Sequence, residues 1–128
     1  MTIQLTSSVF AEGEFIPAKY TCTGQNVSPP LAWSGVPSSA KSLSLTVDDS
    51  DAPGGHFTHW QVTEIPSTAT GIPEGGHVGL EGDNGFGNKG WGGPCPPSGE
   101  HHYVFTLTAL DAGGREVGRG RLVGKYSK

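Results

Sequence analysis

The chain has 128 residues, a length typical of one domain, here residues 1–128, that buries roughly two-thirds of the surface its unfolded chain would expose. Only 16% of the residues are charged and the net charge is −4, so there is no electrostatic signature of nucleic-acid binding. No window approaches the roughly 18 apolar residues of a membrane span, and the N-terminus lacks a basic region followed by an apolar run. We therefore expect a cytoplasmic protein with no nucleic-acid partner and no integral membrane association.

Glycine and proline punctuate the chain, with 21 glycines and 10 prolines falling between short alternating runs. This pattern predicts short strands joined by turns. In the first clear strand, Leu43, Leu45 and Val47 alternate with polar residues and therefore share one buried face. Asp49 has the same parity, so the sequence predicts a carboxylate at the end of this buried face.

A second strand is predicted over residues 59–65, and Pro66 ends it because proline has no N–H to donate to a sheet. Trp60 and Val62 share one parity along this strand, whereas His59 has the other. The alternation alone leaves open which face of the sheet His59 uses.

The last part of the chain predicts a β-hairpin. Residues 103–109 alternate in the same way, with His101 on the parity of the aromatic residues, and residues 116–123 form the next strand. Between them lie residues 111–114, whose two glycines can supply the positive φ angles of a tight turn. Several short strands with this turn spacing predict a mainly β protein, an antiparallel β-sandwich, rather than an α/β fold.

The middle of the chain contains a loop, residues 92–97, in which glycines and prolines hold the backbone rigidly ahead of His101. Residues 85–90 match the letters of a dinucleotide-binding fingerprint, but the prolines that follow prevent the helix that this motif requires. Cys22 and Cys95 are too far apart for a local metal or redox motif, and either one disulfide or two free thiols is compatible with the sequence.

Polar residues from separated segments form one candidate site: Asp49, Asp51, His59, the loop of residues 92–97, His101 and Tyr103. An imidazole held by a carboxylate can present its second N–H to an anion, and glycine-rich turns expose backbone N–H groups that do the same. One interpretation is a phosphate-binding pocket, and the other is a structural aspartate–histidine network at a strand end. A small hydrolytic or metal-dependent enzyme is the weaker alternative, because no side chain has a recognisable nucleophile context and the spacing of His56 and His59 is generic for a metal.

Ordered short motifs run nearly from end to end of the chain: Tyr20-Thr21-Cys22, Ser28-Pro29-Pro30-Leu31, Trp33, Val36-Pro37, Lys41-Ser42-Leu43, Asp51-Ala52-Pro53, His59-Trp60, Ile65-Pro66, Gly92-Gly93-Pro94-Cys95-Pro96-Pro97 and His101. No single one of these motifs identifies a protein family, but their combination in this order is specific. Through them the chain resembles the bacterial and archaeal members of the phosphatidylethanolamine-binding protein family, also called Raf kinase inhibitor-like proteins.

The resemblance implies an antiparallel β-sandwich with a small anion pocket at one end, in a binding and regulatory protein without catalytic residues, metal or cofactor. The expected ligand is phosphate or a phosphorylated head group such as phosphoethanolamine, and the expected protein partner is a kinase or protease that the protein inhibits. Carried over by position, the ligand-binding residues are Asp49, His59, Gly93, Cys95, Pro96, Pro97, His101 and Tyr103. Asp51, from the candidate site above, completes the expected set.

The chain departs from the family pattern at positions that concern this pocket. Ser50 replaces a proline, which puts a cis peptide after Asp49 in doubt, since a cis bond without proline costs about 3–4 kcal/mol. His102 replaces an arginine and removes a fixed cation. Residues 111–114 stand where relatives have a helix-bearing segment, so this C-terminal helical segment is shortened or absent. If that segment borders the pocket, the site is either more open or closed by the second subunit of a homodimer.

Overall fold

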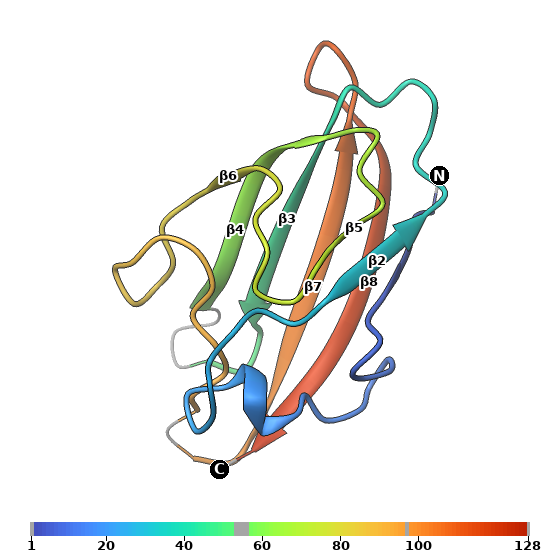
Figure 1. Ribbon diagram of the computed structural model, residues 1–128. Coiled ribbons are helices and arrows are strands. Elements are labelled where there is room, and N and C mark those ends of the chain that lie inside the picture. Colours follow the sequence, from blue (N-terminus) through green and yellow to red (C-terminus); the bar gives the residue numbers. More distant parts are fainter. Residues whose placement is uncertain (1, 53–56, 97, 128) are drawn as a thin grey trace.

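The computed structural model describes residues 2–52, 57–96 and 98–127, which form two antiparallel sheets (Figure 1). The larger sheet has the strand order β6-β4-β3-β7-β8, and the smaller has the order β1-β2-β5. The elements are β1 (Gln4–Thr6), the 3-10 helix η1 (Ala18–Tyr20), β2 (Leu31–Ser34), β3 (Ser42–Asp49), β4 (Phe57–Pro66), β5 (Gly71–Ile72), β6 (Leu80–Glu81), β7 (Glu100–Leu110) and β8 (Glu116–Ser127). The predicted mainly β, antiparallel fold is confirmed.

The centre of the larger sheet follows the alternation in the sequence. Along β3 the buried positions are Leu43, Leu45 and Val47, each fully enclosed, and the intervening positions are half-buried. Strand β7 repeats the pattern, with Phe105 and Leu107 completely buried. These residues face one layer because side chains on a strand alternate between the two sides of its sheet.

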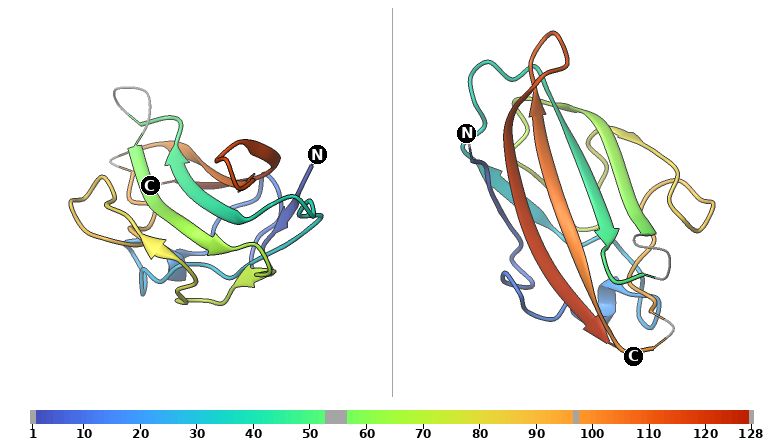
Figure 2. Two further views of the ribbon diagram at one scale, coloured as in Figure 1. Left: turned by 90° about the horizontal axis from the view of Figure 1, so that it is seen from above. Right: turned by 180° about the vertical axis from the view of Figure 1, so that it is seen from behind.

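The smaller sheet covers the buried face of the larger one. Figure 1 shows β2 crossing in front of β7 and β8, and Figure 2 shows the two layers from above and from behind. Leu5, Trp33 and Ile72 from the smaller sheet join the same hydrophobic core. The packing of two sheets over a shared core is the β-sandwich arrangement.

The hairpin between β7 and β8 is confirmed, and its turn is stabilised locally. Asp111 accepts hydrogen bonds at one carboxylate oxygen from the backbone N–H groups of Gly113 and Arg115, both at 2.9 Å, and Gly114 has the positive φ of +82° that the turn needs. Strand β8 runs further than predicted, to Ser127. The two strands are joined directly by this turn, so the expected loss of the helical segment is confirmed.

This turn lies at the far end of β7 from His101, at the top of Figure 1. The more open pocket is expected only if this segment borders the pocket, and β7 keeps the turn that stands in its place a whole strand length away from it. The homodimer expected under the same condition stays a prediction.

The opposite end of the sandwich gathers segments that are distant in sequence. The end of β3 pairs with the starts of β4 and β7 in the lower half of Figure 1, above η1 and the C-terminus. Among the described residues, no helix is long and apolar enough to cross a membrane.

Candidate functional site

Asp49, the last residue of β3, is buried at the end of the apolar face, as its parity predicts. One carboxylate oxygen lies 2.6 Å from His101 Nδ1, and the other accepts a hydrogen bond of 2.9 Å from the backbone N–H of Asp51. A buried carboxylate needs such partners because an unpaired charge inside a protein is costly. Its two oxygens are therefore both held in place.

His101 and Tyr103 lie on the inner face of β7, at its beginning. The side chain of His101 is only 10% exposed, and it directs Nδ1 toward Asp49. Tyr103 lies deeper and is fully buried, and its hydroxyl has no hydrogen-bond partner among the described residues. Burial, together with the charge of Asp49, raises the pKa of Tyr103. The phenol is therefore neutral and forms the floor under the two histidines.

His59 reaches the same space because β4 has an irregularity at this point. Val47 pairs with Trp60 and Asp48 pairs with Thr58, so His59 is an extra residue opposite β3, which is a β-bulge. The bulge allows His59 and Trp60, which are consecutive, to be buried together. The His59 ring packs edge-on against Tyr103, with ring centroids 5.1 Å apart.

The hydrogen-bonding state of His59 is set by the loop in front of it. Nδ1 lies 2.6 Å from the carbonyl oxygen of Gly92, and because a carbonyl can only accept, Nδ1 carries the hydrogen. Burial lowers the pKa of His59, although the backbone of Gly92 and the charge of Asp49 oppose this effect. The ring is therefore mostly neutral at pH 7.

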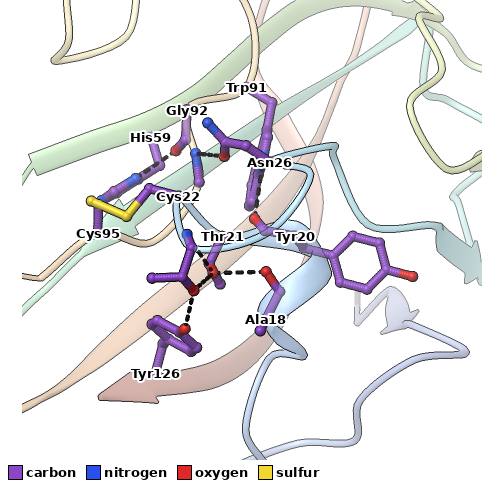
Figure 3. Close-up of a disulfide and its surroundings, with 12 residues drawn as sticks. Ala18, Tyr20, Thr21, Cys22, Asn26, His59, Trp91, Gly92, Cys95 and Tyr126 are labelled. Atoms are coloured by element: carbon purple, nitrogen blue, oxygen red, sulfur yellow. Dashed lines mark hydrogen bonds between the residues drawn. A yellow bond between two sulfur atoms is a disulfide. The ribbon is translucent and has the colours of Figure 1, made fainter. Parts of the chain in front are cut away.

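The loop of residues 91–96 is fixed to the segment that contains η1 (Figure 3). Cys95 forms a disulfide with Cys22, which answers the question that the sequence left open. The backbone N–H of Gly93 donates to Asn26 at 2.8 Å, and Trp91 Nε1 donates to the carbonyl of Tyr20 at 3.2 Å. One covalent bond and several hydrogen bonds therefore hold this loop against the pocket.

These segments enclose a pocket of about 140 Å³ at the end of the sandwich. Its lining residues are Asp49, Ala52, Phe57, His59, Phe86, Cys95, Pro96 and His101. The sequence-based selection missed Ala52, Phe57 and Phe86. Phe86 lies between Gly85 and Gly87, and a large apolar side chain within a glycine-rich turn is the one signal in the sequence that could have indicated it.

Three of the predicted site residues, Asp51, Gly93 and Tyr103, lie near the pocket but do not line it. Asp51 points to the outside, where its carboxylate accepts from His102 Nδ1 at 2.7 Å, and this hydrogen bond lowers the pKa of Asp51. Gly93 lies behind the loop, against Asn26, and Tyr103 lies beneath the histidines. Pro97 lies outside the described residues. The peptide after Asp49 is trans.

Within residues 2–52, 57–96 and 98–127, no group of three or more His, Cys, Asp or Glu side chains could hold a metal ion. The weaker metal-site interpretation also involved His56, which lies outside these ranges. The arrangement that the structure does show is chemically simple: two imidazoles and one carboxylate face a small space that is otherwise lined by apolar groups.

Comparisons with known proteins agree with this architecture. The family model described as phosphatidylethanolamine-binding protein matches residues 6–125. A UPF0098 protein of Methanothermobacter thermautotrophicus is 47% identical over 116 residues, covering 85% of this chain and 77% of that protein. A UPF0098 protein of Pyrococcus horikoshii is 51% identical over 118 residues, and the match covers 82% of this chain but only 58% of the relative.

Other relatives include solved structures and a candidate lipoprotein. LppC of Mycobacterium tuberculosis, named as a candidate lipoprotein, is 48% identical over 84% of this chain and 55% of its own length. The crystal structure of a candidate phosphatidylethanolamine-binding protein homologue from Chlamydia trachomatis superposes with a TM-score of 0.94 at 35% identity, covering 99% of this chain and 98% of that chain. The crystal structure of Escherichia coli YbcL, described as a new member of the mammalian PEBP family, superposes with a TM-score of 0.90 at 32% identity, covering 98% of both chains. The chain belongs to the phosphatidylethanolamine-binding protein family.

Proposed function

We propose that this protein binds a small phosphate-bearing anion, such as inorganic phosphate or phosphoethanolamine, in the pocket lined by Asp49, His59 and His101. The observation that carries the proposal is the convergence of two buried imidazoles from β4 and β7 on one small space. Each ring uses Nδ1 toward the protein, His59 toward Gly92 and His101 toward Asp49. This leaves Nε2 of each ring as the nitrogen available to a ligand.

Proton occupancy then controls anion binding. A neutral imidazole whose Nδ1 carries the hydrogen has only a lone pair at Nε2, and this lone pair repels a phosphate oxygen that has no proton. The complex therefore requires a proton between ring and phosphate, supplied either by the imidazolium or by the phosphate monoanion. Because the complex holds a proton that the separated partners lack at high pH, affinity must rise as the pH falls.

The charge of Asp49 is compatible with an anionic ligand only because of its partner. Asp49 is 4% exposed and lies 2.6 Å from His101, so a protonated His101 and this carboxylate form a pair without net charge. The carboxylate also orients the ring. Removing the Asp49 side chain would have two opposing effects on anion binding. It would leave the His101 ring without the carboxylate that orients it, and it would remove one negative charge from the pocket.

Calorimetric titration with inorganic phosphate at pH 6 and pH 8 tests the proposal. We expect tighter binding at pH 6, and we expect His59→Gln and His101→Gln each to weaken it by roughly tenfold or more. His77→Gln is the matched control, because His77 is an exposed histidine that pairs with Glu81 outside the pocket. Affinity that is equal at both pH values, or an equal loss in the His77 variant, would contradict the proposal.

We further propose that the pocket serves a binding and regulatory role, with a kinase or protease as the inhibited partner, rather than catalysis. Membership of the phosphatidylethanolamine-binding protein family supports a binding role. The loop of residues 91–96 supports it too, because its cross-links make it a rigid wall of a fixed binding site. We expect a pull-down with the wild type to capture a protein partner that inorganic phosphate releases. Phosphate should not release the partner from His101→Gln. Hydrolysis of a phosphate ester that His59→Gln abolishes would contradict it and favour an enzyme.

The cytoplasmic location remains a prediction, and two observations oppose it. The structure contains the Cys22–Cys95 disulfide, and stable disulfides are uncommon in cytosolic proteins. The name of LppC describes a candidate lipoprotein. Trapping free thiols with an alkylating reagent in intact cells would decide, because a cytoplasmic protein should show Cys22 and Cys95 as thiols.

A further inference from the structure

A second cavity, of about 300 Å³, lies beside the anion pocket. The two share Phe86 and Cys95 as lining residues, so the two cavities adjoin at these side chains. The second cavity is lined by all three asparagines of the chain, Asn26, Asn84 and Asn88, and by no charged residue within the described part of the chain. This concentration of amides suggests a site for a polar but neutral group.

The three amides differ in what they have left to offer. Asn84 is used by the protein, since its side chain donates to Gly90 and accepts from the backbone N–H of Phe86. Asn26 accepts from Gly93 through its oxygen, and its NH₂ group has no partner among the described residues. The Asn88 side chain has none there either, and this residue is exposed. Among the described residues, hydrogen-bond donors of Asn26 and Asn88 and the side-chain oxygen of Asn88 therefore line the cavity without a partner.

Phe86 supplies an apolar surface at the junction of the two cavities. It is 48% exposed, although its ring is held by edge-on contacts with Phe57 and His59 at 4.9 and 5.5 Å. Gly92 makes room for it, because a Cβ at Gly92 would lie 2.5 Å from the phenylalanine ring. An aromatic face beside unpaired amides suits a group with both C–H surfaces and hydroxyls.

We propose that this second cavity is a subsite for the neutral, hydroxyl-bearing part of a phosphate ester whose phosphate occupies the pocket at His59 and His101. The inference rests on the proposed anion binding and adds the ligand class, an ester of phosphate with a sugar or other polyol. Such a group can be free or can be the head of a lipid. The net charge of −4 disfavours approach to an anionic bilayer, so we expect the free ester.

The test compares inorganic phosphate with glucose 1-phosphate by calorimetry at pH 6, using the wild type, Asn88→Ala and Gln25→Ala. Asn88 is suitable because its backbone N–H and carbonyl make the hydrogen bonds to Asn84, and alanine retains both. Gln25→Ala is the matched control, an exposed amide outside both cavities. A lipid arm uses vesicles of phosphatidylcholine containing phosphatidylinositol.

We expect glucose 1-phosphate to bind roughly tenfold more tightly than inorganic phosphate, as two added hydrogen bonds would provide. Asn88→Ala should remove most of this gain without changing phosphate affinity, and Gln25→Ala should change neither. Vesicle binding that Asn88→Ala weakens, without a gain for the free ester, would support the subsite with a lipid as its source. Phosphate binding without a gain in either arm, or a gain unaffected by Asn88→Ala, would overturn this inference alone. Failure of all three probes to bind would overturn the proposed function as well.

Discussion

The pocket has two walls, and they are held in place by different means. The strand wall consists of Asp49, His59 and His101 and is carried by the ends of β3, β4 and β7. The loop wall, residues 91–96, has no place in either sheet and is fixed by the Cys22–Cys95 disulfide and by hydrogen bonds to the segment around η1. The strand wall is therefore positioned by the core itself, whereas the loop wall depends on a few local cross-links.

The largest effect on the loop wall should come from removing the disulfide. Cys22 and Cys95 are 73 residues apart, so replacing both with serine releases a long loop in the unfolded chain and should lower the free energy of unfolding by about 4 kcal/mol. Urea denaturation of the double variant measures this loss. Wild-type protein in excess dithiol is the control and should show a similar loss. A stability within about 1 kcal/mol of the oxidised wild type would mean that hydrogen bonds alone hold the loop wall.

Gly93→Ala tests the same wall without touching the disulfide. A Cβ at Gly93 would lie 2.2 Å from Asn26 Oδ1 and 2.4 Å from the Tyr20 carbonyl oxygen, so the loop would have to move. We expect a loss of about 1–3 kcal/mol in stability, together with weaker phosphate binding. Gly113→Ala is the control, since its Cβ would meet nothing closer than Asp111 at 3.5 Å. Equal stabilities for the two variants would show that the loop wall can move to accommodate the added methyl group without a cost in stability.

The same contrast explains what the sequence could predict. Parity along a strand places Asp49 and His101 on the buried face, because alternation is a local property of extended chain. It could not place His59, because the bulge that turns this side chain inward depends on pairing with β3. The disulfide and the Asn26–Gly93 hydrogen bond join segments almost seventy residues or more apart, and nothing local to either segment indicates them. The glycines and prolines around Cys95 predict a rigid loop, but they do not indicate the segment to which that loop is attached.

His59, in the strand wall, should make the free energy of unfolding depend on pH. Burial lowers the pKa of folded His59, whereas the unfolded chain takes up this proton near the usual value of about 6.5. Stability is therefore retained above about pH 6.5 and falls as the pH drops below it, by up to about 1.4 kcal/mol per pH unit. Between pH 7 and pH 5, the wild type should lose about 1 kcal/mol more than His59→Gln. His77→Gln should keep the wild-type slope, and a His59→Gln slope equal to that of the wild type would contradict the assignment.

The smallest effect is expected just outside the strand wall, where the same pair of residue types recurs on the opposite face. Asp51 and His102 are linked at 2.7 Å like Asp49 and His101, but their side chains are 44% and 45% exposed, against 6% and 10% for the inner pair. Exposed ion pairs contribute little because water screens them and competes for their hydrogen bonds. Asp51→Ala should therefore cost less than about 1 kcal/mol in urea denaturation, even though the carboxylate accepts two bonds from His102.

Asp49→Ala is the internal comparison for this prediction, and its larger loss should include phosphate affinity. A carboxylate in the buried pair orients a ring that faces the pocket, whereas the outer carboxylate orients a ring that faces solvent. Asp51→Ala could weaken phosphate binding as much as Asp49→Ala only if the outer pair acted on the pocket. The available route is the hydrogen bond that the Asp51 backbone N–H donates to the Asp49 carboxylate. Because alanine retains that N–H, burial and strand parity should separate the two aspartates in binding as they do in stability.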